Sequence, residues 1–234
     1  MAEILSGKEV AAALNKEIQE KTLLLRERHI IPTLAIVRVG ENKDDISYER
    51  SAARRCEALG IGVKLYHLPA DVTQEALLEM IHRLNEDTDV HGVLMFRPLP
   101  KSLDEAEICR ALAPEKDVDG ITDASMAAVY SGRGPGYPPC TPAACIRVLD
   151  HYGISCEGKK AVVIGRSLVV GRPLALMLMR RNATVTICHT RTKDLAAICR
   201  EADIVAAAAG KARMVTDEFL SPGQVILDVG IHVA

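Results

Sequence analysis

Short apolar segments typical of strands alternate with longer amphipathic segments typical of helices along almost the whole chain. The strand-like segments are TLAIVRV (33–39), GVKLYHL (62–68), GVLMF (92–96), KAVVIG (160–165), TVTIC (184–188), IVAAAAG (204–210) and QVILDVG (224–230). Most are rich in apolar residues on both faces, as strands buried under helices on both sides are. The alternation therefore predicts an α/β fold with parallel sheets.

The alternation is interrupted once, at residues 114–141, where Pro and Gly are dense and no period is visible. We expect this stretch to be a long functional loop, because structureless loops of that length are otherwise uncommon. The prediction is two three-layer α/β lobes joined near residue 140. Residues 1–140 would form an N-terminal α/β lobe, and residues 141–234 a C-terminal lobe with a Rossmann-type parallel sheet.

Composition excludes several classes of function. The net charge is −2 without a basic block, and Trp is absent while Phe occurs twice, which argues against nucleic-acid binding. Seven cysteines without a C-x-x-C pair favour a reduced, cytoplasmic chain over a disulfide framework or a zinc site, so no metal is expected. No signal core and no membrane-spanning apolar run is visible, so no membrane partner is expected.

The segment KKAVVIGRSLVVGRPLA has the order strand, glycine turn, helix start. Gly165 ends the strand and Gly171 begins the helix, with Arg166 and Ser167 in the turn between them. Such a turn offers backbone N–H groups and the positive end of a helix dipole to a phosphate. The spacing G-x₅-G differs from the usual dinucleotide fingerprint, and the same residues would also suit an ordinary strand–helix turn.

The next strand ends in Cys188-His189-Thr190-Arg191-Thr192, without a carboxylate. An NAD site commonly has an acid here for the ribose 2′-hydroxyl. A hydroxyl from Thr190 and cations from Arg191 and Arg166 suit a 2′-phosphate instead, which predicts NADP as the cofactor. Arg191 would equally be explained as a solvated surface cation.

Residue patterns say less about the first half of the chain. Tyr48 opens a helical segment in which Ala52 and Leu59 follow on one face, as they would in an ordinary core stripe. Asp117 and Asp119 lie in PEKDVDG, where acids more often form turns than bind ligands. These spacings alone name no substrate.

Taken in order, several segments resemble the methylenetetrahydrofolate dehydrogenase/cyclohydrolase family: GENKDDISYERSAARRCEALGI, HGVLMFRPLPKSLDE, PEKDVDGIT, PPCTPAACIRVLDHYGI, AVVIGRSLVVGRPLA, ATVTICHTRT and PGQVILDVGI. The resemblance implies a folate-binding catalytic lobe, an NADP-binding lobe, and a homodimer. It implies hydride transfer from 5,10-methylenetetrahydrofolate to NADP⁺, which gives the 5,10-methenyl form. Many members also hydrolyse that product to 10-formyltetrahydrofolate.

The resemblance also assigns roles to single positions. Tyr48 matches the active-site tyrosine beside the folate, and Asp119 the acid that holds the pterin. Thr190 matches a hydroxyl near the 2′-phosphate. The phosphate turn is matched by Gly165, Arg166, Ser167 and Gly171. Two positions that line the cofactor are matched by Thr141 and Ile231.

Two positions depart from the family pattern. The family's active-site lysine falls on Ala52, and the glutamine of its L-V-Q-L-P-L-P segment falls on Phe96. Neither side chain transfers a proton or orients a water, whereas hydride transfer depends mainly on the cofactor. We therefore expect a dehydrogenase with weak or absent cyclohydrolase activity. The alternative is a bifunctional enzyme in which Arg55 or Arg97 replaces the lysine.

A further alternative is a non-catalytic dinucleotide-binding module, which the lost side chains favour and the retained Tyr48 and Asp119 oppose. The family normally continues past D-V-G-I with a P-V-P-G-G-V-G-P segment and a further helix, whereas this sequence ends at Ala234. We expect the sequence to be truncated there, because a chain ending after a buried strand would expose apolar surface.

Overall fold

The computed structural model describes residues 3–229, which form two units. The N-terminal unit comprises residues 6–127 and 134–137, and the C-terminal unit comprises residues 128–133 and 138–229 together with residues 3–5. Both units are built on parallel sheets with helices on their faces, which confirms the predicted α/β class. The predicted lobe boundary near residue 140 stays a prediction.

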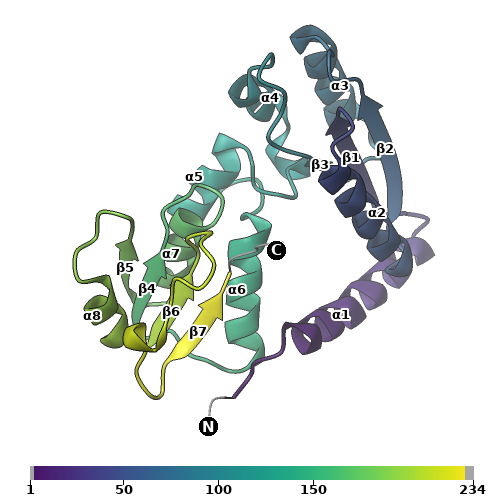
Figure 1. The fold of residues 1–234 in the computed structure, drawn as a ribbon. Helices are drawn as coiled ribbons and strands as arrows, with labels where there is room; N and C mark the ends of the chain where they lie inside the picture. The colour runs from purple at the N-terminus through teal and green to yellow at the C-terminus, as the bar shows by residue number, and fades with distance from the viewer. Residues whose placement is uncertain (1–2, 230–234) are drawn as a thin grey trace. The chain divides into compact units, whose positions relative to one another are not determined.

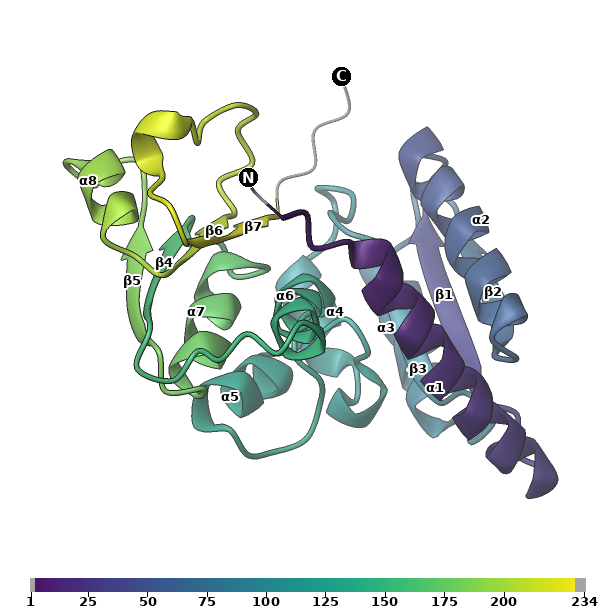
Figure 2. The ribbon, with the colours of Figure 1, turned by 90° about the horizontal axis from the view of Figure 1, so that it is seen from below.

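The sheet of the N-terminal unit has the strand order β2-β1-β3, and all pairs are parallel. Its strands are β1 (Thr33–Val39), β2 (Gly62–Leu68) and β3 (Gly92–Met95). Helix α2 (Lys43–Ala58) lies on one face and α3 (Gln74–Glu86) on the other, as Figure 2 shows. The apolar core of this unit lies on the α3 side, where α3 and α4 (Glu105–Ala111) cover the strands.

The sheet of the C-terminal unit has the order β5-β4-β6-β7, also parallel throughout. Its strands are β4 (Lys160–Ile164), β5 (Thr184–Cys188), β6 (Ile204–Ala207) and β7 (Val225–Asp228), shown side by side in Figure 1. The helices of this unit are α6 (Cys140–His151), α7 (Gly171–Met179), α8 (Leu195–Arg200) and the 3₁₀ turn η2 (Asp217–Phe219).

Strand β4 explains the continuous apolar runs in the sequence. Successive side chains of a strand point to opposite faces of the sheet. Ala161 and Val163 therefore join a core cluster with α6 and α7, and Val162 and Ile164 join a second cluster with α8. A strand buried on both faces needs consecutive apolar residues, and β4 has them from Ala161 to Ile164, after the exposed Lys160.

The structure corrects the prediction of a long irregular loop at residues 114–141. This stretch contains the 3₁₀ turn η1 (Pro114–Lys116) and the helix α5 (Asp123–Ser131), and α6 already begins at Cys140. Thr122 starts α5, because its hydroxyl accepts a hydrogen bond from the Ser125 N–H at 3.1 Å. The dense Pro and Gly hid this start signal in the sequence.

The helical segment that Tyr48 was expected to open begins earlier, at Lys43, because the Asn42 side chain accepts a hydrogen bond from the Asp44 N–H. The first helix, α1, spans Gly7–Glu27. None of the helices within residues 3–229 combines the length and the apolar character that a membrane crossing requires.

Candidate functional site

The turn after β4 brings three stretches of backbone into close contact. Gly165 has φ of +128°, and a Cβ built on it would lie 2.5 Å from the carbonyl oxygen of Ala208, which follows β6. A Cβ on Gly171 would lie 2.2 Å from the Gly165 carbonyl oxygen. Glycine is required at both positions, because real Cβ atoms are not found so close to backbone.

Ser167 organises the same turn. Its hydroxyl accepts hydrogen bonds from the N–H groups of Val170 at 3.1 Å and Gly171 at 3.3 Å, at the start of α7. Arg172 donates from Nε to the carbonyl of Arg166. The turn is thus fixed before any ligand binds, with the positive end of the α7 dipole at its edge. Such a turn suits an anion.

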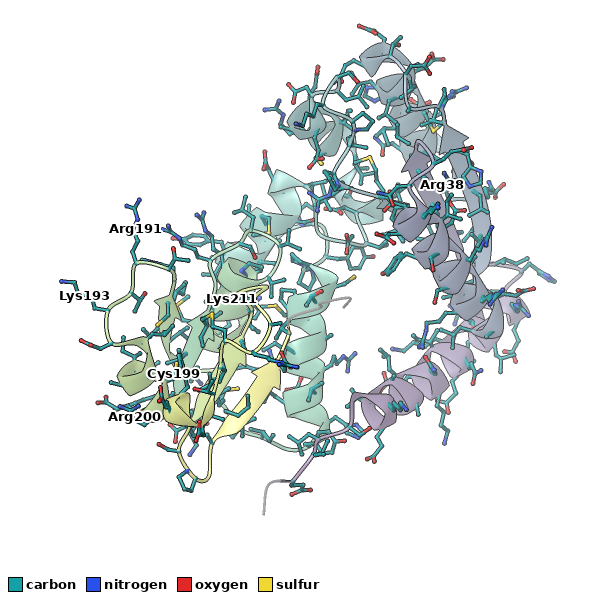
Figure 3. The ribbon with its side chains drawn as sticks, in the orientation of Figure 1. Arg38, Arg191, Lys193, Cys199, Arg200 and Lys211 are labelled. Atoms are coloured by element: carbon teal, nitrogen blue, oxygen red, sulfur yellow. The ribbon has the colours of Figure 1, made fainter. Side chains whose placement is uncertain are left out.

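The loop after β5 lies at the same edge of the sheet, because β4 and β5 pair in parallel and end level at Ile164 and Cys188. It is a tight turn in which the His189 N–H donates to the Thr192 hydroxyl at 2.9 Å, and the Thr192 N–H donates to the His189 carbonyl. Thr190 and Arg191 are exposed at its tip, and Figure 3 shows Arg191 pointing outward.

A cavity of about 510 Å³ lies at the carboxyl ends of β4, β6 and β7 in the C-terminal unit. Its lining includes Ile164, Ala207, Lys211, Arg213 and Ile226. Chain order reverses between β4 and β6, and open α/β sheets bind ligands outside the carboxyl ends of strands at such a switch point. Sequence reasoning missed Lys211 and Arg213, because only the fold brings the loop after β6 to this edge.

In the N-terminal unit, Tyr48 lies in the first half of α2 and is 61% exposed. Its ring meets Phe96, which directly follows β3, edge-on with a centroid distance of 5.5 Å. Ala52 lies one helical turn after Tyr48 and is half-buried. The two positions that depart from the family pattern thus lie beside the tyrosine, which here has an aromatic neighbour.

The two arginines considered as replacements for the lysine have partners elsewhere. Arg55 donates from Nη1 to the Asn15 side chain of α1 at 3.4 Å. Arg97 lies 3.6 Å from the Glu105 carboxylate, at the start of α4. A guanidinium also stays protonated, which makes it a poor general base.

Asp117 is fully buried and organises the loop that carries Asp119. Its carboxylate accepts hydrogen bonds from the N–H groups of Ile121 and Thr122 at 2.9 and 2.8 Å, and from the Ser125 hydroxyl at 2.6 Å. Asp117 bridges in parallel to Val93 of β3. Asp119, two residues further along this loop, is half-buried.

Replacing Asp117 with Ala is expected to lower the free energy of unfolding by about 3 kcal/mol, because each buried donor left unsatisfied costs about 1–3 kcal/mol. Urea unfolding followed by circular dichroism measures the loss as a lower midpoint at an unchanged slope. Asp123→Ala is the matched control, since Asp123 is exposed in the first turn of α5 and should change stability by less than about 1 kcal/mol. Equal losses in both variants would contradict this account.

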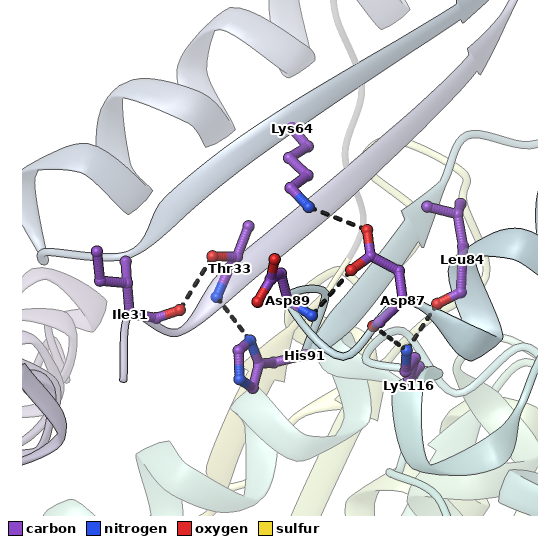
Figure 4. A network of polar contacts seen from close by, with 8 residues as sticks. All are labelled: Ile31, Thr33, Lys64, Leu84, Asp87, Asp89, His91 and Lys116. Atoms are coloured by element: carbon purple, nitrogen blue, oxygen red, sulfur yellow. Dashed lines mark hydrogen bonds and ion pairs between the residues drawn. The ribbon is translucent and has the colours of Figure 1, made fainter. Parts of the chain in front are cut away.

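Lys116, the basic residue of the same loop, binds carbonyl groups at the carboxyl end of α3 (Figure 4). Its Nζ donates to the carbonyls of Leu84 at 2.6 Å and Asp87 at 2.7 Å. Desolvation lowers the pKa of Lys116. The hydrogen bond from Lys64 at 2.9 Å lowers the pKa of Asp87. Lys116 therefore has a structural role in this unit.

Sequence reasoning also missed a charge network on the sheet. Arg38 of β1 and His67 of β2 both contact the carboxylate of Glu49 in α2. The signal was an arginine within the apolar strand TLAIVRV, where a charged residue needs a buried partner.

The remaining predicted positions lie as follows. Thr141 is exposed in the first turn of α6, and Ile231 falls outside the described residues. The structure groups Gly165, Arg166, Ser167, Gly171, Thr190 and Arg191 at one sheet edge. It places Tyr48 against Phe96, just after β3, whereas Asp119 lies in the loop that Asp117 organises. Within residues 3–229, no cluster of three or more His, Cys, Asp or Glu side chains could hold a metal ion. All seven cysteines are free, and burial raises the pKa of Cys199 to about 11.

Comparisons with known proteins match the whole chain. Residues 5–119 match the family model described as tetrahydrofolate dehydrogenase/cyclohydrolase, catalytic domain. Residues 139–234 match the model described as the NAD(P)-binding domain of the same family. A relative named bifunctional protein FolD, from Carboxydothermus hydrogenoformans, is 48% identical over 232 residues, which cover 99% of this chain and 81% of the relative.

Two solved structures are similar throughout. The bifunctional FolD methylenetetrahydrofolate dehydrogenase/cyclohydrolase from Campylobacter jejuni is 39% identical with a TM-score of 0.95, covering 98% of this chain and 82% of that one. The Trypanosoma brucei N5,N10-methylenetetrahydrofolate dehydrogenase-cyclohydrolase, complexed with NADP cofactor and inhibitor, is 35% identical with a TM-score of 0.91, covering 98% and 79%.

Proposed function

This chain belongs to the tetrahydrofolate dehydrogenase/cyclohydrolase family, and from that premise we propose that it oxidises 5,10-methylenetetrahydrofolate to the 5,10-methenyl form with NADP⁺. The observation that carries the proposal is the pair of turns after β4 and β5, which offer glycine backbone, amides and cations and have no acid within residues 165–171 and 189–192. In this proposal residues 1–140 bind the folate and residues 141–234 bind the cofactor.

The cofactor fits the residues present. Gly165 and Gly171 form a close backbone cradle that a Cβ would fill, and the α7 N-terminus faces its edge. Thr190, Arg191 and Arg166 would hold the 2′-phosphate by charge-assisted hydrogen bonds. When bound, NADP⁺ supplies the acceptor for the hydride. The relative from Trypanosoma brucei, whose structure contains NADP, supports this choice of cofactor.

On the folate side, Asp119 would accept hydrogen bonds from the N–H groups of the pterin, and Tyr48 would place its exposed ring beside the substrate. Phe96 limits where the Tyr48 ring can turn, since the two rings meet edge-on. These side chains bind and orient the methylene carbon, and orientation is most of what a protein contributes to hydride transfer. The homodimer that the resemblance implies and the cytoplasmic location that the cysteine pattern favours are part of the same proposal.

A second activity, hydrolysis of the methenyl product to 10-formyltetrahydrofolate, is favoured by the relatives, since several at 42–48% identity are named bifunctional. These names support the bifunctional alternative over our expectation of weak or absent cyclohydrolase activity. Ala52 and Phe96 are what support that expectation, because neither side chain activates water. Hydrolysis of 5,10-methenyltetrahydrofolate well above the buffer rate by the purified chain would establish the second activity.

For the dehydrogenase, we expect an absorbance increase at the reduced-nicotinamide band that depends on methylenetetrahydrofolate. The rate at limiting dinucleotide should be at least about 10-fold higher with NADP⁺ than with NAD⁺, because one charge-assisted hydrogen bond contributes about 1.5–3 kcal/mol. No increase with either dinucleotide would favour a non-catalytic binding module. A higher rate with NAD⁺ would contradict the assignment of NADP.

A further inference from the structure

Helix α2 brings a buried charged side chain to its sheet, beside half-buried side chains such as those of Ile46 and Ala52. Of its described residues, Glu49 alone is fully buried, with 5% of its surface exposed. The apolar cluster described for this unit takes no residue from α2. A helix normally docks through fully buried apolar residues, whereas the most buried side chain of α2 is a carboxylate.

That carboxylate is held from two strands. Arg38 of β1, 7% exposed, donates from Nε to Glu49 Oε2 at 3.1 Å, and also donates from Nη1 to the Gly40 carbonyl. His67 of β2 places Nε2 3.0 Å from both oxygens of the Glu49 carboxylate. Figure 3 shows Arg38 where β1 and α2 face each other. The three side chains therefore connect the carboxyl ends of β1 and β2 to one point on the helix.

That point adjoins the proposed folate site. Glu49 directly follows Tyr48, and Ala52 lies one turn further along the helix. Tyr48 is carried by α2 and meets Phe96 at the end of β3, so the position of its ring relative to the sheet depends on how α2 lies. Apolar contacts are non-directional and let a helix slide or turn, whereas hydrogen-bonded ion pairs fix both distance and direction.

We propose that Arg38, Glu49 and His67 form a positioning network that sets the rotation of α2 and thereby holds Tyr48 against the folate. The inference rests on the proposed function for the identity of the substrate. Buried ion pairs often add little to stability compared with apolar residues of similar volume. The network therefore contributes to the orientation of α2 and not to the free energy of unfolding. The three residues touch no reacting atom and act through Tyr48.

The test is the double variant Arg38→Met with Glu49→Leu, which removes both buried charges together and should fold, because paired apolar replacements of buried ion pairs are often neutral. We expect kcat with methylenetetrahydrofolate to fall about 10-fold, since small displacements in a site are costly, while KM for NADP⁺ stays within about 2-fold. Amide hydrogen exchange in α2 should become about 10-fold faster and that in α3 should not change.

A stable double variant with unchanged kcat and unchanged exchange in α2 would overturn the proposal. His67→Leu provides a second variant, since the imidazole is about half exposed and its loss leaves Arg38 and Glu49 paired. It should lower kcat in the same direction by about 3-fold, and an unchanged kcat and α2 exchange there would also count against the network.

The matched control removes an ion pair in the C-terminal unit, Arg181 with Asp150, whose nitrogen and oxygen atoms lie 2.7 Å apart. Arg181→Met with Asp150→Leu should leave kcat and the exchange of α2 unchanged. The exchange measurement needs no substrate. If the unmodified chain shows no dehydrogenase activity, the proposed function fails, while faster exchange in α2 of the double variant still supports the network.

Discussion

Placing Lys at position 52 together with Gln at position 96 is expected to raise enzyme-dependent hydrolysis of 5,10-methenyltetrahydrofolate about 100-fold, in line with the usual contribution of a positioned acid–base group. Ala52 is half-buried one turn from Tyr48, and Phe96 meets the Tyr48 ring, so both new side chains would lie beside the tyrosine. A stopped-flow absorbance assay of methenyl-folate measures the gain.

The matched control is Ala53→Lys with Phe96→Gln. Ala53 is also half-buried in α2, but one residue along a helix turns the side chain by about 100°. Only the variant at position 52 should gain activity, and an equal gain in the control would show that any nearby cation is enough. If the unmodified chain already hydrolyses methenyl-folate as a bifunctional enzyme, the gain should fall below about 3-fold, far short of the usual acid–base contribution.

Replacing Gly171 with Ala is expected to weaken dinucleotide binding by at least about 10-fold, which corresponds to about 1.4 kcal/mol. The new methyl group would lie 2.2 Å from the Gly165 carbonyl, so either the turn or the start of α7 must move. Moving them displaces the N–H groups that Ser167 aligns. Fluorescence titration with NADPH measures the affinity, and far-UV circular dichroism checks that the fold remains.

Gly7→Ala is the control for this substitution. Gly7 is also the first residue of a helix, and a Cβ built on it meets nothing within 4 Å. Its affinity for NADPH should match that of the unmodified chain. Unchanged affinity in the Gly171 variant would mean that the turn does not contact the dinucleotide, and the site would have to lie elsewhere on the unit.

The strands were predictable because burial on both faces gives them a local signature, as the alternating partners of Ala161, Val162 and Val163 illustrate. Helix α7 was predictable from the glycine that begins it. The start of α2 was placed too late, because a capping hydrogen bond from Asn42 extends the helix beyond its apolar pattern. Helix α5 was missed for a related reason, since its start depends on Thr122 and on the buried Asp117.

The candidate site also contains both local features that the sequence reveals and contacts between distant residues that it does not reveal. Turn residues such as Gly165 and Ser167 follow a strand directly, so a sequence window contains the whole arrangement. The network of Arg38, Glu49 and His67 joins three elements, and nothing local marks Glu49 as buried. Phe96 was visible only as a departure from a family pattern, whereas its contact with Tyr48 depends on how α2 lies over the sheet.

The contact between Gly165 and Ala208 has a consequence for synthesis on the ribosome. Ala208 follows Gly165 by 43 residues, so a growing chain that has just completed α7 still lacks one wall of the cradle. Ala208 follows the end of α7 at Met179 by 29 residues, so at about 5–20 residues per second that wall arrives roughly 1.5–6 s later. A nascent chain halted in this interval contains the whole glycine motif and should bind dinucleotide poorly, because the peptide that closes the turn has not yet been made.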